Sequence, residues 1–218
     1  IVARDRRVID LISYFAAYVF EKSDDNPMLL GSYILEGSKA GAAVAAVWMA
    51  HRVVPLDITG YGRIIGCSIE GAYRFYRFLL EHGPIEVGGR AFDVIPLTRP
   101  DLNIVDYAFH ERGDNSLERM NALNQAVYEQ CSYKSGPVYV NDFITSKTAL
   151  TREEYGETPR AYIERFGIGA GEWDRLGSVY VLRSCILTPY LTGNTTYEEY
   201  WRNFMGAVTR AIERVYGD

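Results

Sequence analysis

Two short β-prone segments flank a pair of glycines at residues 85–95, IEVGGRAFDVI. A glycine pair between alternating apolar residues is typical of a β-hairpin with a two-residue turn, because glycine readily adopts the positive φ that this turn needs. We therefore predict strands over residues 85–87 and 91–95. The sequence His82-Gly83-Pro84 stops helical structure directly before the hairpin. This predicts a domain boundary that separates residues 1–83 from residues 84–218.

The residues after the hairpin alternate between strand-like and helix-like patterns. Runs of β-branched residues predict strands, and apolar residues at steps of three and four predict helices. We expect strands over 103–109 and 178–187, an extended segment over 138–144, and helices over 117–131, 158–166 and 197–216. This order indicates an α+β domain with a mostly antiparallel sheet, covered on one side by helices.

The residues before the hairpin are mainly helical in pattern. Helices are predicted over residues 6–20, about 38–54 and about 61–81, and Pro55 ends the second of them. In the third helix the apolar stripe follows steps of four and three residues. Its members are Ile65, Ile69, Ala72, Tyr76 and Leu79.

Composition excludes several classes of protein. The chain has 218 residues and a net charge of −5, with no basic block, so we expect no nucleic-acid partner. Its longest apolar run covers 11 residues, 40–50, whereas a membrane-spanning helix needs about 20. The three cysteines form no CxxC pair. We therefore expect a cytoplasmic protein with no disulfide framework.

Residues Gly37, Ser38 and Lys39 directly precede the Ala-rich helix and form the first candidate site. Glycine allows a close approach to a ligand, Ser38 can cap the helix, and a helix N-terminus attracts phosphate or carboxylate groups. The spacing differs from the GxxxxGK[ST] phosphate loop. A capped helix start with a solvated lysine explains the same residues equally simply.

Arg183 is the second candidate, because it interrupts the apolar strand Val179-Tyr180-Val181-Leu182-Arg183-Ser184-Cys185-Ile186-Leu187. Strand alternation places Val181, Arg183 and Cys185 on one face. Burying an arginine is costly without an anion, and its planar guanidinium suits a carboxylate. A structural salt bridge, or an edge strand with Arg183 in water, would also account for it.

The remaining residue types give no sign of further chemistry. The sequence contains no HExxH motif, no metal-ligand cluster and no GxSxG motif, so we predict no metal site. The three histidines are expected to be solvated or locally hydrogen-bonded. Because the chain starts at Ile1 without a methionine or a signal-peptide pattern, we expect it to be the C-terminal part of a longer protein.

Taken together, the sequence resembles the group II pyridoxal-phosphate decarboxylases, and is most similar to the bacterial tyrosine decarboxylases. The resemblance runs through nearly all 218 residues in the same order. It is carried by the segments VIDLISYF (8–15), YVFEK (18–22), YILEGSKAGA (33–42), LDITGYG (56–62), SIEGA (68–72), NIVDY (103–107), VLR (181–183) and TPY (188–190).

This resemblance implies a fold-type I enzyme that binds pyridoxal 5′-phosphate and works as a homodimer with its active site at the subunit interface. Residues 1–83 would end the large cofactor-binding domain, and residues 84–218 would form the small C-terminal domain. None of the four lysines follows a histidine, so the Schiff-base lysine is expected upstream of Ile1. The resemblance therefore implies that no catalytic residue lies within this chain.

The resemblance also implies roles for the two candidate sites. Gly37, Ser38 and Lys39 match a stretch that reaches across the dimer to the cofactor phosphate of the other subunit. Arg183 matches an arginine used for a substrate carboxylate. Cys185 stands where the tyrosine decarboxylases have a small polar residue near the substrate ring, which puts a strict tyrosine preference in question.

The expected reaction is decarboxylation of an aromatic L-amino acid, with tyrosine giving tyramine and CO₂. Within the same fold, the alternatives are a glutamate or aspartate decarboxylase and an aldehyde-lyase that resembles sphingosine-phosphate lyase. From another class, the chain could be a non-catalytic dimerisation or regulatory module.

Overall fold

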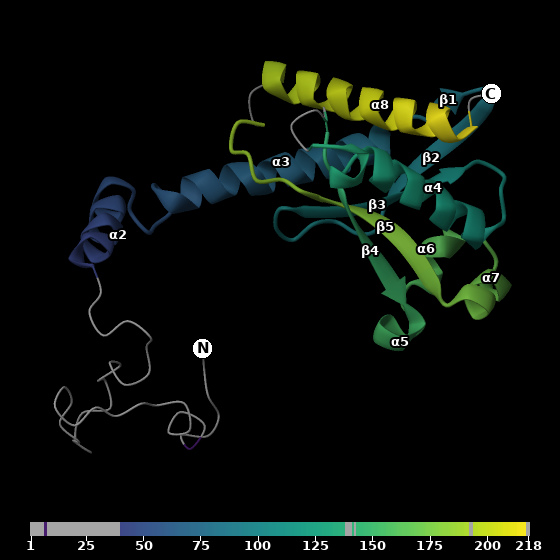
Figure 1. Cartoon of the computed structure of the whole chain (residues 1–218), viewed down its shortest axis with the longest axis horizontal. Helices are drawn as coiled ribbons and strands as arrows, with labels where there is room; N and C mark the ends of the chain where they lie inside the picture. The colour runs from purple at the N-terminus through teal and green to yellow at the C-terminus, as the bar shows by residue number, and fades with distance from the viewer. Residues whose placement is uncertain (1–6, 8–39, 138–140, 142, 192–193, 217–218) are drawn as a thin grey trace. The chain divides into compact units, whose positions relative to one another are not determined.

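The computed structural model describes residues 7, 40–137, 141, 143–191 and 194–216 (Figure 1). The chain divides into two compact units, residues 1–56 and 57–218. The predicted helix over residues 6–20 and the candidate residues Gly37, Ser38 and Lys39 lie outside the described residues.

Helix α2, Gly41–Val53, is the described part of the first unit. It ends before Pro55, as predicted, and Val54 has the extended backbone that a residue preceding proline favours. Its N-cap position is Ala40, which makes no side-chain cap hydrogen bond. The predicted capping residue Ser38 lies outside the described residues. No residue of α2 is buried.

Helix α3, Tyr61–Glu81, has the bounds that the sequence predicts. It follows a turn in which the Asp57 carboxylate accepts hydrogen bonds from the Thr59 backbone N–H and hydroxyl. A Cβ atom on Gly62 would lie 2.8 Å from the Asp57 carbonyl oxygen, so only glycine fits there. The buried face differs from the predicted stripe, because Ile65 is exposed. The residues of α3 that are buried in the structure are Ser68, Gly71, Ala72, Phe75 and Leu79.

Five antiparallel strands form one sheet in the order β1-β2-β3-β5-β4, which confirms the predicted mostly antiparallel sheet. The strands are β1 Ile85–Val87, β2 Arg90–Pro96, β3 Ile104–Glu111, β4 Ser146–Thr151 and β5 Ser178–Cys185. The predicted hairpin is confirmed, and both turn glycines have positive φ, 57° at Gly88 and 75° at Gly89. Strand β4 was not predicted. The extended segment expected over 138–144 contributes no strand in its described residues.

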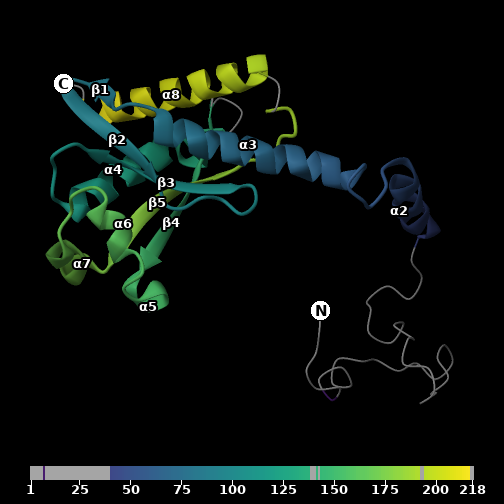
Figure 2. The ribbon, with the colours of Figure 1, turned by 180° about the vertical axis from the view of Figure 1, so that it is seen from behind.

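Helices cover both faces of this sheet, so the prediction of helices on one side is wrong. One core cluster joins β2, β3 and β5 to α3, to α4 (Leu117–Gln130) and to α8 (Asn194–Tyr216). The other cluster lies on the opposite face and includes α6 (Arg160–Glu164) and α7 (Ala170–Leu176). Figures 1 and 2 show α8 on one side of the strands and α6 and α7, with the short α5 (Arg152–Tyr155), on the other.

The helices predicted over residues 117–131 and 197–216 are confirmed, with small differences in their bounds. The expected helix over 117–131 is α4, and its apolar residues Leu117, Met120, Leu123 and Val127 are all buried. The expected helix over 197–216 is α8, which begins three residues earlier than predicted, at Asn194. The helix expected over 158–166 is limited to α6.

Helix α4 hydrogen-bonds to β3 and β5 where these two strands no longer pair with each other. Strands β3 and β5 pair only between residues 104–107 and 182–185. Beyond that pairing, Asn121 accepts a hydrogen bond from the Tyr180 backbone N–H at 2.8 Å and donates one to the Ser178 carbonyl at 2.9 Å. The side chain of Asn124 binds the backbone of Phe109 in β3 in the same way. Two asparagine amides therefore replace the missing β-ladder.

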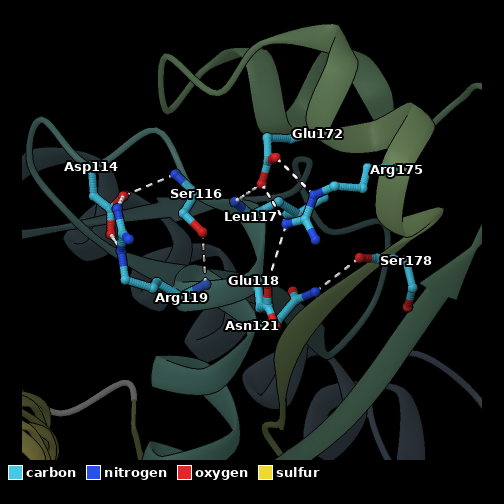
Figure 3. A network of polar contacts seen from close by, with 9 residues as sticks. All are labelled: Asp114, Ser116, Leu117, Glu118, Arg119, Asn121, Glu172, Arg175 and Ser178. Carbon is cyan, nitrogen blue, oxygen red and sulfur yellow. Dashed lines mark hydrogen bonds and ion pairs between the residues drawn. The ribbon is translucent and has the colours of Figure 1, made fainter.

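A network of polar side chains fixes the N-terminus of α4 (Figure 3). The Ser116 hydroxyl accepts from the Arg119 backbone N–H, and the Glu172 carboxylate accepts from the Leu117 backbone N–H at 3.0 Å. Arg175 binds both Glu172 and Glu118. These contacts satisfy two free N–H groups of the first turn, those of Leu117 and Arg119, and connect α4 to α7. The network has a structural role.

Candidate functional site

Arg183 lies near the end of β5, in the middle of a polar row across three strands. Its register partners are Asp106 in β3 and Ser146 in β4. Paired residues in an antiparallel sheet point to the same face. The three side chains therefore share the face of the sheet that also carries Val181 and the α6–α7 cluster.

Neither of the two simpler explanations for Arg183 is found among the described residues. Strand β5 lies between β3 and β4, so Arg183 is not on an edge strand. The side chain is half-buried, and its Nε donates to the Ser146 hydroxyl oxygen at 3.1 Å. Among the described residues no carboxylate oxygen lies within 4 Å of its guanidinium nitrogens. The structural salt bridge is therefore also absent from this part of the chain.

Ser146 fixes the direction of the guanidinium. Its hydroxyl donates to the Arg183 carbonyl oxygen at 3.0 Å and accepts from Nε of the same residue. Because a hydroxyl has one proton and two lone pairs, these two bonds are compatible. Among the described residues, none forms a hydrogen bond or an ion pair with the terminal nitrogens of Arg183, so these nitrogens can bind an external anion.

Asp106 contributes a second charge to this row. Burial raises the pKa of its half-buried carboxyl, and the nearby Arg183 charge offsets only part of that rise. The phenol of Tyr162 also faces this region and donates to the Ile95 carbonyl oxygen at 2.6 Å. Nothing in the strand pattern of residues 103–109 marked Asp106 as a site residue. Its register with Arg183 became visible only in the sheet.

Cys185 is the last residue of β5 and pairs with Ile104. It is exposed and lies two residues beyond Arg183, on the same strand face, as the alternation predicts. The structure thus brings Arg183 and Cys185 together at one end of the sheet. Gly37, Ser38 and Lys39 cannot be related to them, because they lie outside the described residues.

Apolar side chains surround this end of the sheet and are exposed to solvent. They lie at or just before the start of β3, just before β4 and just after β5. The exposed members are Leu102, Ile104, Ile144, Leu187 and Tyr190. An exposed apolar rim around a half-buried arginine is typical of a surface that contacts further protein or a ligand.

A chain of buried hydroxyl groups supports the opposite face. Tyr107 Oη lies 2.9 Å from Ser184 Oγ and 3.5 Å from Thr145 Oγ1. Thr145 in turn donates to the Arg183 carbonyl oxygen at 3.1 Å. Burial raises the pKa of Tyr107 far above its ordinary value, so the phenol stays protonated. These contacts join β3, β5 and the start of β4 directly behind Arg183.

The described residues contain no group of three or more His, Cys, Asp or Glu side chains that could hold a metal ion. They also include no helix that is both long enough and apolar enough to span a membrane. His110 Nε2 lies 2.7 Å from the Asp114 carbonyl oxygen, and His82 Nδ1 lies 2.6 Å from that of Gly83. Both histidines are locally hydrogen-bonded, as predicted.

Comparison with known proteins supplies the family. Residues 71–212 match the family model described as "Tyrosine decarboxylase, C-terminal". Three curated relatives are named L-tyrosine decarboxylase. They come from Enterococcus faecalis (47% identical over 216 residues), Levilactobacillus brevis (46% over 216) and Enterococcus faecium (44% over 215).

These alignments cover 99% of this chain but only 34–35% of each relative. The chain therefore spans about a third of the length of the curated relatives that it matches. The family match itself covers most of the chain, including α4, all five strands and nearly all of α8. The chain belongs to the tyrosine decarboxylase C-terminal family.

Proposed function

We propose that this chain is the C-terminal part of a pyridoxal-phosphate-dependent decarboxylase that converts L-tyrosine to tyramine and CO₂. The observation that carries the proposal is Arg183, a half-buried arginine held through Nε, with no carboxylate within 4 Å among the described residues. The names of the three relatives support the reaction and the substrate.

Pyridoxal phosphate, when bound, supplies the electron sink for the bond that breaks as CO₂ leaves. The N-terminus of α2 is compatible with its phosphate group. The first turn of α2 contains no acidic residue, and Ala40 offers no side-chain cap. Free N–H groups at such a terminus favour an anion. We assign the phosphate contacts to Gly37, Ser38 and Lys39, acting on the cofactor of the other subunit.

Arg183 and Cys185 would bind the substrate. The guanidinium of Arg183 orients the α-carboxylate through its terminal nitrogens, while Ser146 holds Nε. Cys185, exposed on the same face, would lie near the aromatic ring of tyrosine. The apolar rim around Arg183 would exclude water by contact with the rest of the protein.

The proposal includes the architecture implied by the resemblance. We place the boundary between the large cofactor-binding domain and the small C-terminal domain before residue 84. The whole protein would have fold-type I, form a homodimer through its active-site interface, and work in the cytoplasm. The Schiff-base lysine would belong to the residues upstream of Ile1.

Substitution of Arg183 in the full-length protein tests this function. We expect Arg183→Met to reduce CO₂ release from L-tyrosine at least tenfold while the absorbance of bound cofactor stays unchanged, because one charged contact to the substrate is lost. Arg112→Met is the matched control, since Arg112 in the same domain pairs with Asp93. Equal activity of the Arg183 and Arg112 variants would contradict the role of Arg183.

The choice of substrate needs a separate measurement. We expect the full-length protein to release an amine from L-tyrosine faster than from L-glutamate, L-aspartate or other aromatic amino acids. Faster release from an acidic amino acid would favour the alternative decarboxylases. No amine release from any of them, with cofactor bound, would favour a non-catalytic module.

A further inference from the structure

Asp106 lies directly opposite Arg183 but forms no ion pair with it within 4 Å. Cβ atoms of residues paired in this way are about 4.5–5.5 Å apart. Ser146 holds Nε of Arg183 on the β4 side. The Asp106 carboxylate therefore acts on the guanidinium through its charge, without occupying the nitrogens that face a ligand.

We propose that Asp106 is a positioning residue that limits the affinity of Arg183 for the substrate carboxylate, and that protonation of Asp106 raises this affinity. The inference rests on the proposed function, because it takes Arg183 as the carboxylate contact. An ionised Asp106 offsets part of the arginine charge and repels an incoming carboxylate. A protonated Asp106 does neither.

Such a restraint is useful in a decarboxylase. The substrate carboxylate leaves as neutral CO₂, so an arginine that binds it too strongly stabilises the ground state more than the transition state. A negative charge beside the arginine reduces that ground-state stabilisation. Asp106 would therefore raise the KM without lowering kcat.

The carboxyl and imidazole groups on this face of the described strands are those of Glu86, Asp93, Asp106 and His110, and Asp106 is the one in register with Arg183. Asp93 pairs with Arg112, and His110 Nε2 lies 2.7 Å from the Asp114 carbonyl oxygen. Burial raises the pKa of Asp106 above the value of a free aspartate, so it takes up a proton at a higher pH than an exposed carboxyl group. Tyr162 of α6 has a pKa raised by burial and stays neutral. Arg165 of α6 donates to the carbonyl oxygens of Pro96 and Leu97. A guanidinium group cannot be deprotonated in proteins, and a serine hydroxyl carries no charge, so acidification does not change the charge of the other two members of the polar row.

The test uses the full-length enzyme with its cofactor bound. We expect Asp106→Asn to lower the KM for L-tyrosine about three- to tenfold at neutral pH, since one opposing charge is removed, with kcat equal or lower. In the wild type the KM should fall as the pH falls through the pKa of Asp106. In Asp106→Asn this pH dependence should be lost. Inhibition by tyramine, which has no carboxylate, should be the same in both proteins.

Two variants act as controls. Asp93→Asn removes a carboxylate from β2 that pairs with Arg112, away from Arg183, and should leave the KM and its pH dependence unchanged. Asp106→Ser is a second neutral variant and should reproduce the effect of Asp106→Asn. An unchanged KM for L-tyrosine in both Asp106 variants would overturn the inference. So would an inhibition constant for tyramine that falls as much as this KM does.

The double variant Asp106→Asn/Arg183→Met separates this inference from the proposed function. If Arg183→Met raises the KM and the Asp106 substitution has no effect in either background, Asp106 has no role but the function stands. If Arg183→Met leaves the KM unchanged, the carboxylate site itself is wrong, and the inference falls with it. An Asp106 effect that requires Arg183 supports both.

Discussion

Asn124 of α4 binds the main chain of Phe109 in β3 through two hydrogen bonds. The Phe109 N–H donates to Asn124 Oδ1 at 2.9 Å, and Asn124 Nδ2 donates to the Phe109 carbonyl oxygen at 2.8 Å. The asparagine has no exposed surface. One side chain thus satisfies both polar groups of a buried residue that has no strand partner on this side.

Asn124→Ala should therefore destabilise the chain strongly. Both backbone groups of Phe109 would lose their partner in the core, at about 1–3 kcal/mol each. We expect a loss of about 2–4 kcal/mol in the free energy of unfolding, measured by urea denaturation followed by circular dichroism. Asn203→Ala is the matched control, because Asn203 lies exposed on α8. Its cost should stay within about 0.5 kcal/mol; similar losses for both variants would contradict the role of Asn124.

The turn of the β1–β2 hairpin gives a second prediction. Gly89 has φ of 75°, a conformation that is strained for other residues, whereas Gly83 has no positive φ. Alanine at Gly89 should cost about 1 kcal/mol in the free energy of unfolding, because an L-residue disfavours left-handed backbone. Gly83→Ala has open space around its new Cβ and should be close to neutral. An equal effect of the two substitutions would exclude backbone strain as the cause.

Helix α3 and the β1–β2 hairpin could be predicted from the sequence because neighbouring residues determine where they begin and end. Helix α3 has the predicted bounds because Gly60 precedes it and the His82-Gly83-Pro84 sequence follows it. The hairpin was predictable because a glycine pair selects a two-residue turn. Strand β4 was not, because its residues, SKTALT, show no apolar alternation, and it is stabilised by its pairing with β5.

The site was predictable only in part. Arg183 and Cys185 could be placed on one face by alternation along a single strand. Asp106 and Ser146 belong to strands 77 and 37 residues away from Arg183 in the sequence, so their contact depends on sheet register. Register follows from tertiary packing, which a local pattern does not report. The buried face of α3 was misplaced for the same reason: tertiary packing decides which of its residues are covered, and Ile65 is exposed.

Phe204 of α8 packs at the centre of an aromatic cluster. Its ring centroid lies 4.7 Å from that of Phe143, 5.1 Å from that of Phe75 and 5.9 Å from that of Tyr107. Phe204→Ala should destabilise the chain by about 3–5 kcal/mol, because it leaves a cavity between α8 and the sheet. Urea denaturation would measure this loss. Met205→Ala, at a half-buried position of the same helix, should cost clearly less. If the Met205 variant is the less stable of the two, the cluster is not the centre of the core.

Cys131 and Cys185 should differ sharply in their reaction with a thiol reagent. Burial raises the pKa of Cys131 to about 11, although the charges of Arg210 and Arg214 oppose that rise. At pH 8 only about a thousandth of this thiol would be ionised, and the thiolate is the reactive form. Cys185 is exposed. In this chain, a short treatment with iodoacetamide followed by peptide mass spectrometry should find Cys185 labelled and Cys131 unlabelled.

Raising the pH from 8 to 9 should increase the slow labelling of Cys131 about tenfold, because its thiolate fraction rises tenfold per pH unit this far below its pKa. Denaturation in urea should make the two rates similar. Rapid labelling of Cys131 in the folded chain at pH 8 would show that the end of α4 is open to solvent, contrary to the structure.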